Sequence, residues 1–331
     1  GKGGDVTLES SALSAPGDSH LTLDGQLRGY GVSGGGRLLI QAGDIFIGQS
    51  DKPLANNTLH LQPELFDKGF SAYSLIGLNR LDVADNTRVD VLMPVYRFGD
   101  AAANQVSGTA PGQALELWTP TLYQENPLKA QLTQRTGASL ALQAGSSEIA
   151  LVDPTRNSLT LGQGSRISVD PGQRINLRSA GQLTVDGQLN AWGGTIDIRQ
   201  QQFGSINVAD SSQTADKQIH NRSIWIGEHA VLDVAGRVAT GIDALGRVYG
   251  QVGKGGSIII GGETDAKKAT ATSADAYVIV RSGARLEASG AQAMLDIAGQ
   301  GPTLVATDGG RISLSSYNGL FIEGGLRAAA G

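Results

Sequence analysis

Histidine is the first residue type to consider for chemistry in this 331-residue chain, because imidazole binds transition metals and moves protons. The four histidines are His20, His60, His220 and His229. They are far apart in the sequence, and none belongs to the paired spacing that zinc sites use. The histidines therefore predict no metal centre.

Two glycine-rich runs, residues 34–36 and 253–257, resemble phosphate-binding loops only weakly. Both lack the complete glycine–lysine frame and a following helix. A calcium-binding β-roll needs a third glycine where this chain has Ile196. The sequence therefore predicts no cofactor, and it offers no catalytic, cofactor-binding or metal-binding residue.

Charged residues on the expected strands are the remaining source of catalysis. Asp197 and Arg199 alternate with apolar residues, as do Asn176 and Arg178, so all four are expected to point outward. Carboxylates clustered on a sheet would suit an enzyme that cleaves polysaccharides. Scattered charges more commonly keep an exposed sheet soluble. No cluster crosses successive strands, so the chain is predicted not to be an enzyme, with a polysaccharide-active enzyme as an alternative.

Aromatic residues are few, and four positions can be interpreted. Trp118 and Tyr123 lie in the longest expected insertion, where they would stack on a sugar or a protein partner or anchor the insertion. Anchoring is the preferred interpretation. Trp225 alternates with apolar neighbours and is expected to point outward, whereas Trp192 precedes a glycine pair and is expected at a corner.

A repeated glycine pair organises the elements that carry these residues. The pair is followed by one free position and then by an apolar–any–apolar triplet, in copies that begin at residues 3, 35, 193, 255 and 309. A recurring corner that opens a short strand is typical of a β-solenoid, in which the chain winds in stacked coils. An all-β sandwich is the alternative, because hairpins use similar turn residues.

Strict alternation of apolar and polar residues supports the same interpretation. Residues 20–27 and 183–189 share a strand that ends in Asp-Gly-Gln-Leu, and residues 158–201 hold four consecutive strand–turn units. Glycine is expected to supply positive φ at the corners. The side chains expected to point into the core are Val6, Leu8, Leu38, Ile40, Ile196, Ile198, Ile258, Ile260, Ile312 and Leu314.

Insertions interrupt the repeat, and we expect them to project sideways from one continuous segment that spans residues 1–331. The larger two cover about residues 49–69 and 99–135, where prolines accumulate. Within the second, residues 126–132 have the asparagine cap and first-turn proline of a short helix. Smaller insertions are expected at 209–220, 237–254, 263–274 and 300–308.

Composition narrows the class of protein. Glycine supplies 47 residues without a collagen period, and the 40% hydrophobic content is too high for a disordered linker. A net charge of −5 argues against nucleic acid as a partner. No apolar stretch is long enough to span a bilayer, and cysteine is absent. The chain begins at Gly1, and we interpret it as a piece of a longer protein.

The glycine-pair corners and the Asp-Gly-Gln-Leu units resemble the shaft of a filamentous-haemagglutinin-like exoprotein, the secreted partner of a bacterial two-partner secretion system. The segment 66–91, with its Phe-Asp-Lys-Gly-Phe-Ser-Ala-Tyr start, adds to the resemblance. The repeat covers nearly the whole chain and is moderately specific. The resemblance implies a right-handed parallel β-helix and secretion through an outer-membrane transporter. The amino-terminal secretion domain of such proteins is not recognisable here, nor is a toxin-like tail.

The function that follows from the resemblance is mechanical. We expect the chain to be an internal shaft region of a secreted or cell-surface bacterial adhesin that mediates attachment, cell–cell contact or biofilm formation. Its expected partners are the transporter, contacted through a region outside this chain, and an unidentified surface receptor or extracellular polysaccharide. A stalk that delivers a contact-dependent growth-inhibition toxin is a further alternative.

Overall fold

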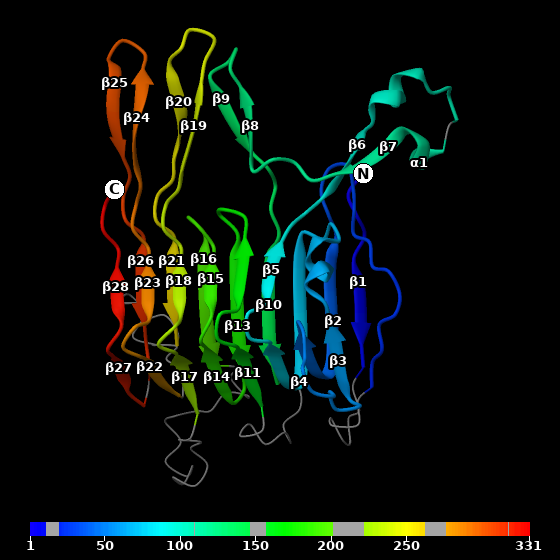
Figure 1. Cartoon of the computed structure of the whole chain (residues 1–331), viewed down its shortest axis with the longest axis vertical. Coiled ribbons are helices and arrows are strands. Elements are labelled where there is room, and N and C mark those ends of the chain that lie inside the picture. The colour runs from blue at the N-terminus through cyan, green and yellow to red at the C-terminus, as the bar shows by residue number, and fades with distance from the viewer. Residues whose placement is uncertain (11–19, 109, 146–156, 201–221, 262–275, 317) are drawn as a thin grey trace, which may run out of the picture.

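The computed structural model describes residues 1–10, 20–108, 110–145, 157–200, 222–261, 276–316 and 318–331. In this part of the chain the fold is all-β, and its main sheets are built from short parallel strands that belong to successive coils. The coils lie side by side from β1 near the N-terminus to β28 at the C-terminus (Figure 1). The parallel pairing supports the predicted solenoid and excludes the antiparallel sandwich.

Three rows of stacked strands make up the coils. Row 1 contains β1 (Val6–Glu9), the first parts of β2 (Arg37–Ile47) and β4 (Ala72–Val83), β10 (Ser139–Ala144), β13 (Arg174–Ser179), β16 (Thr195–Gln200), β21 (Ser257–Ile260) and β26 (Arg311–Leu314). Row 2 contains β3 (Thr58–Leu61), the second parts of β2 and β4, β11 (Ser158–Leu161), β14 (Gln182–Val185), β17 (Ser223–Ile226), β22 (Tyr277–Val280) and β27 (Leu320–Ile322). Row 3 contains β5 (Arg88–Val91), β12 (Arg166–Val169), β15 (Gln188–Asn190), β18 (Val231–Asp233), β23 (Arg285–Glu287) and β28 (Gly325–Arg327).

Equivalent apolar side chains stack in register along the core. In row 1, Ile175 pairs with Ile196, Ile196 with Ile258, and Ile258 with Ile312. The inward facing of all ten predicted core residues is confirmed. Six of them are fully buried, and the four in the first and last coils are partly buried and pack against the same cluster. One hydrophobic core therefore runs through the stacked coils.

The glycine pairs serve close packing between coils. A Cβ on Gly36 would lie 1.9 Å from the carbonyl oxygen of Gly4 in the preceding coil. A Cβ on Gly310 would lie 1.9 Å from the carbonyl oxygen of Gly256. The expectation of positive φ at these corners is wrong: among the five predicted pairs, only Gly193 has a positive φ, of 61°. Glycine is required there because backbone from the next coil occupies the space of a side chain.

The expected loop at residues 49–69 is only partly a loop. β3 joins row 2 as a parallel neighbour of β2, and the short 3-10 helix η2 (Pro63–Asp67) packs beside β5. Phe66, Phe70 and Tyr73 form a buried aromatic cluster near this end of the core. The prediction of a loop failed because the chain turns back and places β3 on the N-terminal side of β2, within the same coil. The proline content of the segment did not indicate this turn.

The strand expected at residues 20–27 is not formed, and the insertion of β3 explains its absence. β3 occupies the position beside β2 that this segment would otherwise take in row 2. The apolar side chains of Leu21, Leu23 and Leu27 still pack against the core. The alternation therefore predicted which residues face inward, although the backbone lacks a partner strand.

Hairpins leave the coils at one corner, between row 3 and row 1, and project to one side of the coils (Figure 1). They are β6 (Val95–Phe98) with β7 (Leu115–Trp118), β8 (Tyr123–Asn126) with β9 (Gln131–Gln134), β19 (Val238–Ile242) with β20 (Val248–Val252), and β24 (Gln292–Ile297) with β25 (Gly301–Ala306). Between β6 and β7 lie η3 (Asp100–Asn104) and the single-turn helix α1 (Pro111–Ala114).

Three of the expected insertions correspond to these hairpins, and two others lie outside the described residues. The insertion expected at 237–254 is the β19–β20 hairpin. The excursion expected at 99–135 begins at β6 and ends with β9. The helix expected at 126–132 is wrong: a turn joins β8 to β9, in which Asn126 accepts the Lys129 N–H and Ala130 has a φ of 47°. The insertion expected at 300–308 is the second half of the β24–β25 hairpin. Insertions expected at 209–220 and 263–274 fall on residues that are not described.

Replacement of Ile196 by aspartate tests the inward ladder. Ile196 is completely buried between Ile175 and Ile258, so Ile196→Asp places an unpaired charge in the apolar core. We expect the free energy of unfolding to fall by about 3 kcal/mol or more. The measurement is urea unfolding monitored by circular dichroism. Thr184→Asp, at an outward position of β14, is the matched control and should change stability little; equal stability of the two variants would contradict the assigned facing.

Candidate functional site

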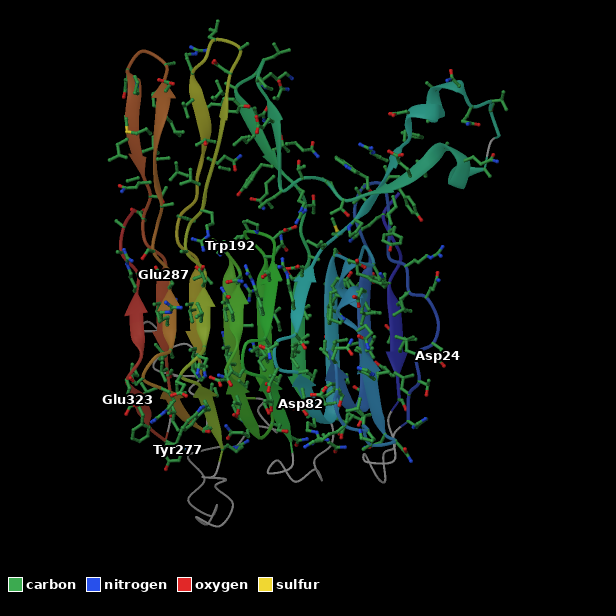
Figure 2. All side chains as sticks on the ribbon, in the orientation of Figure 1. Asp24, Asp82, Trp192, Tyr277, Glu287 and Glu323 are labelled. Carbon is green, nitrogen blue, oxygen red and sulfur yellow. The ribbon has the colours of Figure 1, made fainter. Side chains whose placement is uncertain are left out.

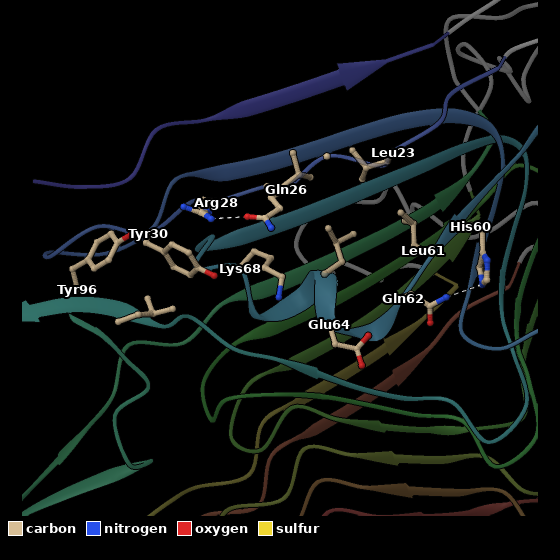
Figure 3. Close-up of a pocket in the computed structure, with 14 residues that line it drawn as sticks. Leu23, Gln26, Arg28, Tyr30, His60, Leu61, Gln62, Glu64, Lys68 and Tyr96 are labelled. Atoms are coloured by element: carbon tan, nitrogen blue, oxygen red, sulfur yellow. Dashed lines mark hydrogen bonds between the residues drawn. The ribbon is translucent and has the colours of Figure 1, made fainter. Parts of the chain in front are cut away.

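A cavity lies near the N-terminal end of the described chain, where the regular coil spacing is interrupted. It measures about 580 Å³ and separates residues 23–30 from β3, η2 and Lys68. Figure 3 shows Leu23, Gln26 and Arg28 along one side, and Leu61, Gln62, Glu64 and Lys68 along the other. Tyr30 and Tyr96 lie at one end and His60 at the other. We call this cavity the N-terminal groove.

The groove has an apolar floor and a polar rim. Its floor is formed by leucines, of which Leu61 is buried, and Leu23, Leu27 and Leu65 pack against the core. Its rim carries exposed amide and charged groups. This combination is typical of sites where apolar area supplies affinity and a few polar groups fix orientation.

Two tyrosines close one end of the groove. The rings of Tyr30 and Tyr96 meet edge to face with centroids 5.7 Å apart. Gly69 allows this arrangement, because a Cβ there would lie 2.1 Å from the Tyr30 ring. Burial raises the pKa of Tyr30, and the nearby Lys68 ammonium opposes that shift. The phenol therefore remains a neutral hydrogen-bond donor at physiological pH.

Two cations flank the same end. Arg28 donates to Gln26 Oε1 at 2.5 Å, so its only described partner is neutral. Lys68 pairs with Asp67 at 2.5 Å. At the opposite end, His60 Nε2 lies 2.6 Å from the carbonyl oxygen of Gly48. Arg28 is therefore a cation at the tyrosine end with no acidic partner among the described residues, whereas Lys68 shares its charge with Asp67.

A second groove, of about 410 Å³, is lined by His229, which contacts Asp186 beside the groove. Asp186 Oδ2 lies 3.2 Å from His229 Nδ1, as in the dyads of serine hydrolases. The other ring nitrogen, Nε2, lies 3.1 Å from the side-chain amide of Gln163. An amide takes the position that a nucleophilic hydroxyl would need, so the geometry gives no activated nucleophile.

Asp197 is not part of a solvated face, which corrects the sequence interpretation. Its side chain is almost fully buried, and it bridges Arg199 Nε at 2.6 Å and Arg178 Nη2 at 3.1 Å. Arg178 and Arg199 pair with each other in register on neighbouring strands, so both guanidinium groups reach the same carboxylate. The charge is held by two partners in a structural network.

Two carboxylates share one arginine on the outward side of row 2. Arg80 contacts Asp44 Oδ2 at 3.2 Å and Asp82 Oδ2 at 3.3 Å. Burial raises the pKa of Asp82, while the Arg80 guanidinium and the hydrogen bond with Thr160 oppose that shift. This is a pair of carboxylates that the sequence analysis did not single out, because Asp44 and Asp82 lie on different coils and meet only through the register of β2 and β4.

The aromatic residues singled out in the sequence lie around the hairpins. Trp118 stacks against Arg97 of the same hairpin at 4.6 Å, and Tyr123 lines a crevice of about 340 Å³ at the base of the hairpins. Trp192 lies at the corner before β16, as expected, and donates to Asp233 at 3.1 Å. Figure 2 shows Trp192 where the hairpins leave the coils. Trp225 points outward from β17, as expected.

Three hairpins are joined into one projecting row, which we call the hairpin row: β8–β9, β19–β20 and β24–β25 (Figure 1). Gln251 of β20 donates to the Leu132 carbonyl of β9 at 2.8 Å, and the Val248 N–H donates to Asp296 of β24 at 2.6 Å. The row exposes apolar side chains at Ile242, Leu245, Met294, Ile297 and Leu304. Such a surface is typical of a place for contact with another molecule.

The loop at the tip of β19–β20 is held in one shape by Asp243. Its carboxylate accepts the N–H groups of Leu245 and Arg247 and pairs with the Arg247 guanidinium. Backbone hydrogen bonds, led by that of Arg247, lower the pKa of Asp243, although its desolvation opposes the shift. Leu245, which is 76% exposed, is therefore presented on an ordered tip.

The described histidines lie on different elements of the structure. His20 precedes the N-terminal groove, His60 lies on β3 and His229 precedes β18, while His220 is outside the described residues. Within the described ranges, no group of three or more histidine, aspartate or glutamate side chains is arranged to hold a metal ion. No helix in those ranges has the length and apolar character needed to cross a membrane.

The pH dependence of stability tests the environment of Asp82. A carboxyl whose folded pKa is raised contributes stability below its unfolded value, and that contribution is lost as pH rises through the folded pKa. We therefore expect Asp82→Asn to be slightly more stable than the wild-type chain at pH 7, by less than about 1 kcal/mol given the partial exposure. That advantage should disappear below pH ~4.

The measurement is urea unfolding at a series of pH values, with Asp24→Asn as the control. Asp24 is exposed on the segment beside the N-terminal groove and lies far from Asp82 in Figure 2. A loss of stability at pH 7 in Asp82→Asn but not in Asp24→Asn would show that the pairing with Arg80 outweighs burial, contrary to the expectation.

Comparisons with protein-family models, with curated proteins and with solved structures find no match to this chain. Its function is therefore inferred from its own residues. Three features support an inference: the stacked coils, the hairpin row and the N-terminal groove.

Proposed function

We propose that this chain is a section of the shaft of a secreted or cell-surface bacterial exoprotein of the filamentous-haemagglutinin-like, two-partner secretion type. In this proposal it is an adhesin shaft that holds binding surfaces away from the cell for attachment, cell–cell contact or biofilm formation. Its coils form a right-handed parallel β-helix. The outer-membrane transporter would be engaged by a region outside this chain.

The observation that carries the proposal is the continuous apolar ladder. Side chains at equivalent positions of β13, β16 and β21 stack directly on one another, and backbone hydrogen bonds join each coil to the next. A ladder of this kind resists bending and can be extended by adding coils without a new core. Right-handed winding is favoured because parallel strands with crossover connections almost always adopt that hand.

The hairpin row supports display as the role of this section. The three hairpins leave the same corner of three different coils and project to the same side, so they form a single surface. The exposed apolar side chains of the hairpin row are not part of the hydrophobic core, because the core lies within the coils. The shaft therefore does not need them for stability. A surface receptor or an extracellular polysaccharide is the partner that fits an adhesin of this type.

Bead adhesion tests the proposal. Latex beads coated with the chain are expected to bind cultured epithelial cells or a layer of bacterial biofilm matrix. The variant Ile242→Ser, Leu245→Ser, Leu304→Ser should reduce the number of bound beads several-fold, because it removes exposed apolar contacts and leaves the core intact. Val32→Ser, Phe98→Ser, Val106→Ser is the matched control, with exposed apolar residues that lie outside the hairpin row.

Two results would contradict this role. Beads coated with the wild-type chain that bind no better than albumin-coated beads would show that the section does not mediate attachment. An equal loss in both triple variants would show that adhesion depends on general surface hydrophobicity and not on the hairpin row.

A polysaccharide-active enzyme is the second candidate, and Asp44, Arg80 and Asp82 favour it. Two carboxylates on one sheet face, one of them with a raised pKa, are the groups that glycoside cleavage uses as acid and base. If this site is active, incubation with plant and bacterial polysaccharides will release reducing ends. Asp82→Asn would then lower the rate by about 10²-fold or more. The absence of reducing ends from every polysaccharide would exclude this candidate.

A further inference from the structure

The strand β3 has an edge that no strand of the described chain covers. In row 2 it pairs only with β2, whereas the strands that follow are paired on both sides as far as β22. An uncovered edge presents backbone donors and acceptors that can pair with another extended chain. The N-terminal groove lies along this edge, because His60, Leu61 and Gln62 all line it.

The hydrogen bonds of β3 show which backbone groups face the groove. The carbonyl oxygens of Asn57 and Leu61 accept from Asp44 and Gly48, so these odd-numbered positions point toward β2. Backbone groups alternate along a parallel strand, so the even-numbered positions point the other way. The groups that face the groove are therefore the C=O of Thr58, the N–H and C=O of His60, and the N–H of Gln62.

These four groups have no hydrogen-bond partner within the described residues. The N–H of Thr58 and the C=O of Gln62 are used in local turns, with Ala55 and Leu65 respectively. The opposite wall of the groove, residues 21–28, is not paired with β3: among the described residues, no backbone hydrogen bond joins the two segments. The groove is thus lined on the β3 side by unused donors and acceptors at the spacing of a strand.

We propose that the N-terminal groove binds an extended peptide, which adds to the free edge of β3 as a further strand. The peptide has apolar side chains at alternate positions, for the leucine floor, and a carboxylate at one end. The carboxylate of the peptide lies beside Arg28 and Lys68. The peptide residues next to that carboxylate contact Tyr30 and Tyr96. Strand addition of this kind takes affinity from backbone hydrogen bonds and specificity from alternate side chains.

The dimensions and chemistry of the groove agree with this occupant. An extended chain advances about 3.3 Å per residue, so four residues cover the length of β3. The cavity of about 580 Å³ accommodates a short segment of this kind. A saccharide would use the rim and the tyrosines but would leave the alternating donors and acceptors of β3 unmatched. Peptide recognition is a property beyond the proposed shaft function and does not depend on it.

Fluorescence anisotropy with defined peptides tests the proposal. The probes are fluorescein-labelled peptides with the sequences of residues 5–9 and 283–287, because both alternate apolar side chains and end in a glutamate. The test variant is Gly25→Trp: Gly25 lines the groove, and a Cβ there meets nothing within 4 Å, so the tryptophan fills the groove without disturbing the fold. Gly112→Trp in α1 is the matched control, at a glycine with the same open surroundings.

We expect the wild-type chain and Gly112→Trp to bind at least one probe with equal Kd within about twofold, and Gly25→Trp to raise that Kd about tenfold or more. Methylation of the peptide's backbone nitrogens should weaken binding about fivefold or more for each hydrogen bond removed. Arg28→Gln should weaken binding of these glutamate-ended peptides more than binding of their analogues that end in glutamine.

Three results would overturn the proposal. The first is no binding of either peptide to the wild-type chain. The second is unchanged binding of the methylated peptides, which would show that the edge of β3 is not used. The third is binding of sulfated or neutral oligosaccharides that Gly25→Trp abolishes while the peptides do not bind, which would assign the groove to a glycan.

Discussion

The close approach of backbone at the corners of successive coils is the constraint on which the rest of this structure depends. Parallel ladders require each coil to follow its neighbour at strand spacing, about 4.8 Å. At the start of row 1 the carbonyl oxygen of one coil lies where a Cβ of the next would be, as at Gly36 and Gly310. Only glycine meets that requirement without moving the backbone. The register of the apolar ladder, and with it the core, follows from these corners.

A regular stack leaves little room for a site, so the distinctive surfaces lie where the regularity is interrupted. The hairpins leave the coils between row 3 and row 1, where an added segment does not disturb the ladder. The N-terminal groove exists because β3 is inserted beside β2 and displaces residues 20–28 from the sheet. Both surfaces combine a rigid base with side chains that the core does not need. This division between a structural ladder and variable attachments is typical of repeat folds.

Polar residues on the outward faces depend on contacts between coils. Asp197 takes Arg178 from the preceding strand and Arg199 from its own, and Asp44 and Asp82 share Arg80. Pairing across coils keeps these charges satisfied where water has limited access. In the sequence such residues look separate and solvated, because partners in neighbouring coils are many residues apart and only the register brings them together.

The amino-acid sequence by itself determined the solenoid, the inward facing of residues such as Ile196 and Ile258, and the place of the excursion after residue 98, because local alternation and glycine corners repeat in every coil. Only the tertiary structure decided that β3 joins row 2, that residues 126–132 form a turn between two strands, and that a groove opens beside residues 20–28. The first and third outcomes depend on which segment pairs with the edge of β2, and that choice between separate segments leaves no local pattern in the sequence. The turn depends on the pairing of β8 with β9, which the helix-like cap at Asn126 did not indicate.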